Sequence, residues 1–171
     1  MNESSPHGIN YQAYRQVVMG RNGMVCSGHP LASQAGIDVL QKGGCAVDAA
    51  IAVAAALNVV EPQSSGIGGD GFIMLYLKGS DEIQIVNATG AAPYAATPEK
   101  FSKGIDSKGI RSVSVPGLLK GWTEAHERYG SLELSEVLKP AIGLAENGFP
   151  VSYVLATNIA EDEWVCKFPT S

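Results

Sequence analysis

The chain has 171 residues, of which 45% are hydrophobic and 17% charged, a composition that can bury one sizeable core and is typical of a globular protein. With 17 acidic against 12 basic residues the net charge is -5, and no Lys/Arg cluster could neutralise a row of phosphates. Composition therefore argues against an intrinsically disordered chain and against a nucleic-acid partner.

No segment of the sequence is suited to a membrane. The most apolar stretch, residues 46–60, is too short to span a bilayer and carries Asp48. The polar start, MNESSPHGINYQAYRQ, lacks the apolar run of a signal peptide. We expect no membrane partner and a cytoplasmic location, with secretion as the alternative if a leader has been removed.

Residues that bind metals are few and scattered. The cysteines are Cys26, Cys45 and Cys166, and the histidines are His7, His29 and His126. The cysteines are odd in number and show neither a CxxC pair nor the Cys/His spacing of a zinc site. We therefore expect no disulfide framework, no metal site and no cofactor.

The first predicted elements are a lead-in, a strand and a helix. Residues 1–22 combine turn formers with few periodic apolar positions, so we expect a mobile lead-in before a first strand at residues 24–27. From Pro30 onward apolar residues recur at helical spacing, which predicts an amphipathic helix. Gly43 and Gly44 are a suitable stop for this helix.

A buried helix and a hairpin are predicted next. Residues 46–60 are alanine-rich and apolar on nearly every face, which indicates a helix that is buried on most sides and ends before Pro62. Residues 71–78 and 82–88 are strand-like runs separated by a Gly-Ser-Asp turn. This pattern predicts an antiparallel hairpin.

Two further helices complete the predicted elements. Residues 117–130 form one, closed by a glycine, and residues 134–147 form another that Pro140 either kinks or splits. Helices clustered around antiparallel strands indicate an α+β fold. We interpret residues 23–171 as one incomplete domain, because the last residues show no completed final element.

Glycines are concentrated in residues 61–71, EPQSSGIGGDG. Gly66, Gly68 and Gly71 spell GxGxxG, but a dinucleotide-binding turn follows a strand and opens a helix, and here the order is reversed. No Gly-Lys-Ser/Thr follows, as it would in a P-loop. The loop is therefore interpreted as a tight helix-to-strand connection packed near other backbone, with nucleotide binding as a distant alternative.

Two motifs carry a family resemblance. Residues 44–50, GCAVDAA, and residues 62–72, PQSSGIGGDGF, resemble in order and spacing the GGNAVDAA-type helix start and glycine-rich loop of the gamma-glutamyltranspeptidases. The similarity covers roughly residues 23–155 and continues through SVPG at residues 114–117. It implies an N-terminal nucleophile hydrolase with an αββα sandwich, of which this chain holds an incomplete part.

The resemblance also implies where the chemistry lies. Members of the family are precursors that cut themselves before a threonine, whose hydroxyl is the nucleophile and whose new amino group is the base. This threonine is expected well beyond Ser171, and Thr170 is no substitute because a cut there would leave only a dipeptide. We expect a metal-free amide hydrolase or acyltransferase, completed by a second subunit of the same precursor. No catalytic residue is expected in this chain, which should be inactive alone.

One substrate contact of the family is expected here. The resemblance implies a D-x-R-E-x-A-P pattern whose arginine grips the substrate α-carboxylate. This sequence has Thr89 at the arginine position and Gly90 at that of the glutamate. Because threonine carries no charge, we expect an amide or acyl substrate other than an ordinary gamma-glutamyl compound.

Two other residues are candidates for the site. Arg111 could supply the missing charge from a neighbouring loop, or it could be an exposed arginine without a special role. Asp70 stands where the family usually has glycine, and it could face the pocket or cap the turn. The competing interpretation of the whole chain is a non-catalytic binding or scaffold relative, which a threonine at a downstream self-cleavage site would exclude.

Overall fold

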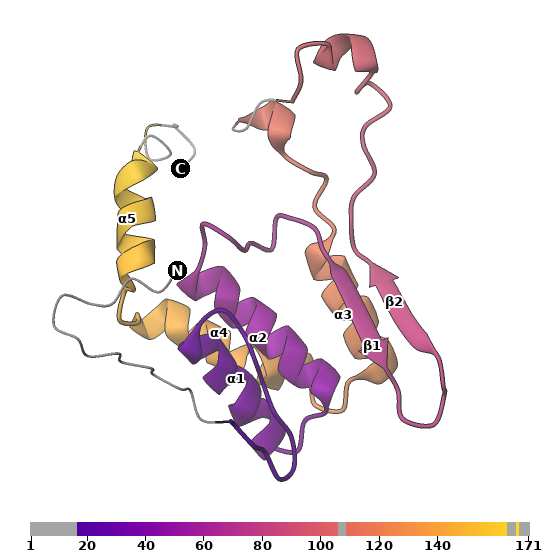
Figure 1. The fold of residues 1–171 in the computed structure, drawn as a ribbon, viewed down its shortest axis with the longest axis vertical. Helices are drawn as coiled ribbons and strands as arrows, with labels where there is room; N and C mark the ends of the chain where they lie inside the picture. The colour runs from indigo at the N-terminus through magenta and orange to yellow at the C-terminus, as the bar shows by residue number, and fades with distance from the viewer. Residues whose placement is uncertain (1–16, 106–108, 164–166, 168–171) are drawn as a thin grey trace, which may run out of the picture.

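A computed structural model describes residues 17–105, 109–163 and 167 of the chain. Most of the predicted lead-in lies outside these residues, as do His7, Cys166 and Thr170. Helices gather on one side of a single β-hairpin (Figure 1). The elements are α1 (Pro30–Gln41), α2 (Ala46–Val60), β1 (Phe72–Tyr76), β2 (Ile83–Asn87), η1 (Pro98–Phe101), η2 (Ile110–Ser112), α3 (Leu118–Tyr129), α4 (Leu134–Asn147) and α5 (Tyr153–Glu161).

The predicted strand at residues 24–27 is wrong. These residues belong to no helix or strand and lie along α1 and α2, whereas a strand requires a hydrogen-bonded neighbour. Val25 packs closely over Gly36 of α1 and beside Val53 of α2. A Cβ atom added to Gly36 would lie 2.9 Å from Val25 Cγ1 and 2.6 Å from Val53 Cγ2. The segment is therefore held by side-chain packing on helices.

Helix α1 begins and ends as the sequence predicts. His29 caps its start, where Nδ1 accepts a hydrogen bond of 3.2 Å from the N–H of Leu31. After its last turn Gly43 adopts a φ of +91°, a conformation that glycine tolerates without steric cost. The amphipathic helix and its glycine stop are confirmed.

Helix α2 is the centre of the core and has the predicted bounds. It packs against α1, α3 and α4, and small side chains allow this close approach. Its buried apolar residues are Val47, Ala49, Ile51, Ala52, Ala55, Ala56 and Val60. The prediction of a helix buried on most sides is confirmed.

The first turn of α2 contains a fully buried carboxylate, that of Asp48. It accepts hydrogen bonds from the N–H of Cys45 (2.9 Å), the hydroxyl and N–H of Ser131 (2.9 and 3.1 Å) and the N–H of Leu132 (3.3 Å). Burial alone would raise the pKa of Asp48, but the hydrogen bonds from Cys45 and Ser131 outweigh it and hold that pKa below its usual value. Asp48 thus ties the start of α2 to the α3–α4 connection.

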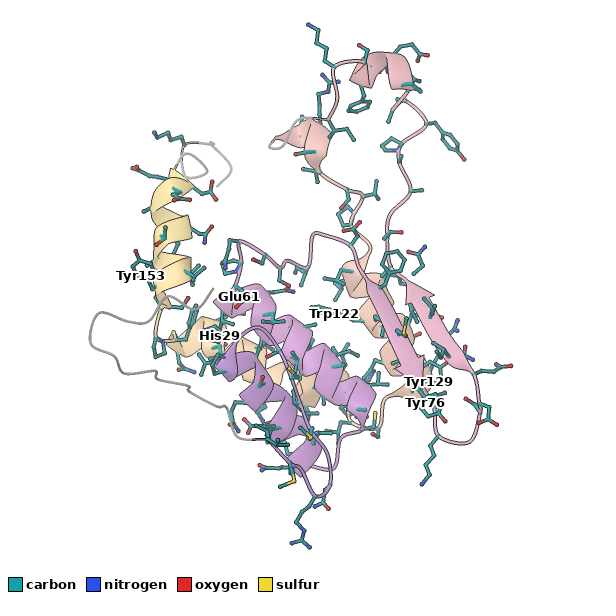
Figure 2. The ribbon with its side chains drawn as sticks, in the orientation of Figure 1. His29, Glu61, Tyr76, Trp122, Tyr129 and Tyr153 are labelled. Atoms are coloured by element: carbon teal, nitrogen blue, oxygen red, sulfur yellow. The ribbon has the colours of Figure 1, made fainter. Side chains whose placement is uncertain are left out.

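Strands β1 and β2 form the predicted antiparallel hairpin, with Phe72 opposite Asn87 and Tyr76 opposite Ile83. The inner face packs on the core, to which α3 contributes the buried Trp122 (Figure 2). The outer face is apolar as well, and its side chains are between 60% and 70% exposed. They are Phe72, Met74, Tyr76, Ile83 and Ile85.

The C-terminal helices agree with the prediction in part. Helix α3 is confirmed, and α4 runs unbroken through Pro140, so the alternative of a split helix is wrong. Helix α5 was not predicted, although Ser152 is a good cap whose Oγ accepts the N–H of Leu155 at 3.1 Å. In the described part of the chain, no helix combines the length and apolar character needed to cross a membrane.

Candidate substrate-binding site

The glycine-rich loop joins α2 to β1 and is tied by backbone hydrogen bonds to two distant segments. The carbonyl of Gly69 accepts the N–H groups of Gly117 (3.0 Å) and Leu118 (3.1 Å) at the start of α3. The carbonyl of Gly71 accepts the N–H of Ala88 (2.9 Å), just after β2. The three segments, together termed the glycine junction, are residues 66–71, 87–90 and 115–121.

Glycine is required where these segments meet. A Cβ atom on Gly117 would overlap the carbonyl oxygen of Ala88, and one on Gly90 would overlap that of Val115. On Gly71 it would lie 3.0 Å from Leu118 Cδ1. The predicted tight connection packed near other backbone is therefore confirmed. The order of helix, loop and strand is the reverse of a dinucleotide-binding turn.

The junction brings together two predicted site residues that are distant in sequence. Asp70 directly precedes Gly71, and Thr89 directly follows Ala88, so the two residues flank the same backbone hydrogen bond. Both side chains are exposed. Their relative position is fixed by backbone contacts rather than by contact between the side chains.

The Thr89 side chain is bonded to its neighbour. The Oδ1 atom of Asn87 accepts both the N–H of Thr89, at 2.9 Å, and its hydroxyl, at 2.5 Å. Asn87 and Thr89 line a hollow of about 370 Å³ that also includes Lys120 and Glu124 of α3. The Nζ atom of Lys120 lies 3.6 Å from Glu124 Oε2, and Glu124 also pairs with Arg128. The cation that lines this hollow, Lys120, therefore forms an exposed pair with a carboxylate.

Asp70 lines a second hollow, of about 380 Å³, together with Ser64, Ser65 and Leu118. Within the described residues its carboxylate has no hydrogen-bond or ion-pair partner. The turn is closed by the backbone instead, through a bond of 3.1 Å from the N–H of Gly69 to the carbonyl of Gly66. Of the two alternatives for Asp70, a cap of the turn has no supporting hydrogen bond among the described residues, and a role toward the hollow stays a prediction.

Arg111 does not supply a charge to Thr89. It lies in η2, where its guanidinium donates to the carbonyl of Lys100 and sits 4.8 Å from the ring centroid of Phe101. The segment that carries η1 and η2 projects away from the helices (Figure 1). The alternative of Arg111 as a replacement cation is therefore not supported.

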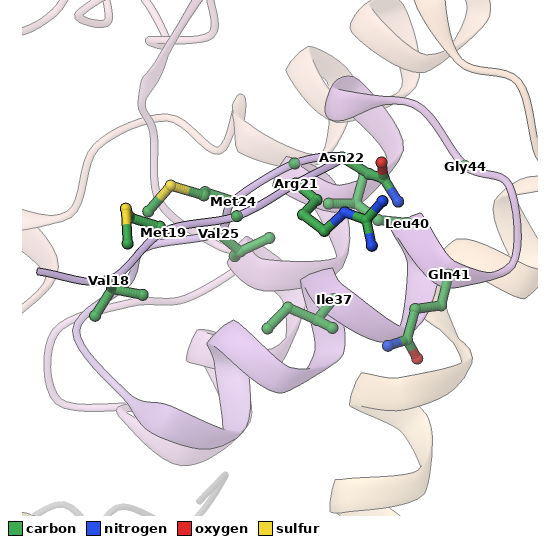
Figure 3. A pocket seen from close by; sticks show the side chains of 12 residues that line it. Val18, Met19, Arg21, Asn22, Met24, Val25, Ile37, Leu40, Gln41 and Gly44 are labelled. Atoms are coloured by element: carbon green, nitrogen blue, oxygen red, sulfur yellow. The ribbon is translucent and has the colours of Figure 1, made fainter.

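A larger hollow, of about 630 Å³, lies between residues 18–25 and α1 (Figure 3). Its lining is mainly apolar and includes Val25, Ile37 and Leu40, with Arg21 as its charged side chain. It lacks the converging polar groups that would orient a substrate. The glycine junction is the better candidate site, because it gathers the polar groups.

The described residues offer no evident metal site. No group of three or more His, Cys, Asp or Glu side chains that could hold an ion is found among them. Cys26 and Cys45 are free thiols there, and Cys166 lies outside these residues. The remaining functional groups of the junction are the carboxylate, hydroxyl, amide and ammonium groups described above.

Comparison with known proteins identifies the family. The profile described as gamma-glutamyltranspeptidase matches residues 32–169. The chain belongs to the gamma-glutamyltranspeptidase family. It is 45% identical over 161 residues to the glutathione hydrolase proenzyme of Bacillus subtilis strain 168, a match that covers 89% of this chain and 27% of that relative.

Solved structures confirm the α+β fold class. Helicobacter pylori gamma-glutamyltranspeptidase matches with a TM-score of 0.81 and 34% identity, covering 91% of this chain and 46% of that chain. A cephalosporin acylase from Bacillus halodurans also matches with a TM-score of 0.81, at 42% identity, covering 96% and 32% of the two chains. The chain therefore spans less than half the length of these relatives.

Proposed function

We propose that the chain is the front portion of an amide hydrolase or acyltransferase whose nucleophile is the N-terminal threonine of a second subunit cut from the same precursor. Family membership supports this reaction class, and the Bacillus subtilis relative is named as a proenzyme. The 171 residues then contribute substrate contacts at the glycine junction. The nucleophile and its amine base come from the second subunit.

The substrate of this enzyme is an amide or acyl compound other than an ordinary gamma-glutamyl compound. The observation that carries this proposal is the state of Thr89, whose hydroxyl is bonded to Asn87; Lys120, the cation that lines the same hollow, is paired with Glu124. A substrate carboxylate would find no guanidinium at this position, and the ammonium group of Lys120 beside it is exposed and shared with Glu124. Losing one partner of a desolvated charge pair costs about 2–5 kcal/mol, or roughly thirtyfold or more in affinity.

The intact mass of the protein expressed from its complete natural gene tests the reaction class. Two chains after incubation, the second beginning with threonine, are expected for a self-processing precursor. A chain that never cleaves would favour the non-catalytic binding or scaffold relative. This measurement requires no knowledge of the substrate.

A Thr89→Arg variant of the processed protein tests the substrate class. Thr89 is exposed, so the longer side chain can be accommodated and can bring a free guanidinium to the hollow. We expect roughly a thirtyfold gain in kcat/KM for gamma-glutamyl anilide, the lower end of the range given above. A Ser112→Arg variant, in the projecting segment, is the matched control. No gain over that control would count against the proposed role of Thr89.

A further inference from the structure

We propose that Asn22 is a site of spontaneous modification, at which the side-chain amide is lost and aspartate or isoaspartate is formed. The chain contains two Asn-Gly pairs, Asn22–Gly23 and Asn147–Gly148, and both are exposed. An asparagine followed by glycine is especially reactive, because glycine has no side chain to hinder attack by its own backbone nitrogen. The structure places the two pairs in different surroundings, which favour reaction at the first. This modification does not depend on the proposed enzyme activity.

The reaction takes place within the chain and needs only water as its second reactant. The backbone nitrogen of Gly23 loses its proton and bonds to Cγ of Asn22, while the bond from Cγ to Nδ2 breaks. The amide nitrogen leaves as ammonia with that proton, and a succinimide ring remains. Water then opens the ring at one of its two carbonyl carbons. Opening at one carbonyl gives aspartate, and opening at the other gives isoaspartate, in which the main chain runs through the former side chain.

Both reacting groups of the first pair are free to approach each other. Within the described residues, neither the Asn22 amide nor the N–H of Gly23 has a hydrogen-bond partner. The two residues belong to no helix or strand, and Asn22 lies in a bend that lines the hollow between residues 18–25 and α1 (Figure 3). Rotation of the backbone that brings the nitrogen of Gly23 onto Cγ therefore disrupts no regular structure.

The second pair is held by helix α4. Asn147 is the last residue of this helix, and its Nδ2 atom donates a hydrogen bond of 2.9 Å to the carbonyl of Gly143. The group that must leave is therefore bound to the preceding turn. Ring closure would also rotate the helical backbone at Asn147 and unwind the last turn of α4. The same dipeptide should react more slowly here.

Modification at Asn22 alters the point where the chain begins to pack on α1. A Cβ atom added to Gly23 would lie 3.4 Å from Leu40 Cδ1, so the residue after Asn22 is already close to the helix. Either product adds a negative charge beside Arg21, the charged residue in the lining of the hollow. Isoaspartate also adds a methylene group to the main chain directly before the residues that pack on α1.

Peptide mapping by mass spectrometry follows both sites in one sample of the complete protein, expressed from its natural gene and incubated in mildly alkaline buffer. Replacement of the amide by a carboxyl group changes the mass of each peptide, and chromatography separates isoaspartate from aspartate. We expect Asn22 to be modified about tenfold faster than Asn147, because one hydrogen bond must break at Asn147 before the attack. In denaturant the two rates should be nearly equal, since neither site is then held by structure.

The Gly23→Ala variant tests the attack itself. The added methyl group hinders the backbone nitrogen, yet the fold has room for it, because its contact with Leu40 would be an ordinary one. The rate at Asn22 should fall to that of Asn147 or below. The rate at Asn147 in the same sample is the control and should not change.

Two results would overturn the inference. One is a rate at Asn147 that equals or exceeds the rate at Asn22 in the folded protein. The other is an Asn22 that stays intact in the folded protein while the denatured chain reacts at both sites, because the native structure would then protect the first pair.

Discussion

Replacing Asp48 with alanine should destabilise the fold more than any other single loss of charge in the described residues. The carboxylate is fully buried and receives three backbone N–H groups and one hydroxyl, from Cys45, Ser131 and Leu132. Without it these donors lose their acceptor at the meeting point of α2 and the α3–α4 connection. An unsatisfied buried donor costs about 1–3 kcal/mol, and Ser131 is exposed enough for water to compensate in part. We expect a total loss of about 3 kcal/mol.

Thermal unfolding followed by far-ultraviolet circular dichroism measures this loss. For a domain of this size, 3 kcal/mol corresponds to a decrease in Tm of roughly 6–12 °C. Asp48→Asn should cost less, about 1 kcal/mol, because the amide oxygen can replace Oδ2, which accepts most of the bonds. Glu136→Ala, which removes an exposed ion pair with Lys139, is the control. An Asp48→Ala variant as stable as this control would refute the view that Asp48 links the two segments.

Two further predictions concern stability. Because the pKa of Asp48 is lower in the folded state, the carboxylate stabilises the fold above the usual Asp pKa, and this stabilisation is lost as pH falls through the folded pKa. The Tm difference between wild type and Asp48→Asn should therefore shrink on acidification below about pH 4. A Tm difference that grows on acidification would contradict this sign. Gly36→Ala should lower the free energy of unfolding, measured in urea, by about 1–3 kcal/mol, because the added Cβ atom would crowd Val25 and Val53. The control Gly143→Ala, in an open position of α4, should raise it by up to about 1 kcal/mol. Equal effects of the two substitutions would show that Gly36 is not a packing site.

Local sequence patterns were enough to predict the helices whose ends and burial they determine directly. Apolar spacing, a proline start and a glycine stop predicted α1, and the alanine-rich run predicted the burial of α2. The error at residues 24–27 has a different cause. The sequence signal for a strand is local, but a strand exists only if another strand is in reach, and here the neighbours are helices.

The candidate site depends on contacts that sequence does not encode locally. The resemblance pointed to Thr89 and Asp70 separately, and their common position at one backbone hydrogen bond requires the Gly71–Ala88 pairing. Lys120 and Glu124 were not predicted, because only the packing of α3 beside β2 brings them to Thr89. Asn87 had a detectable signal, since asparagine two residues before a hydroxyl side chain favours a local turn.

The outer face of the hairpin connects the fold to the proposed function. A sheet with solvent on one side alternates apolar and polar side chains, whereas β1 is apolar on both faces, as in a sheet buried between two layers. Strand β2 of the same hairpin ends at Asn87, which also belongs to the glycine junction and is bonded there to Thr89. In the proposed enzyme, a layer that covers Phe72, Met74 and Ile85 would also approach the junction. Burial of this apolar face and completion of the substrate site would then be one event.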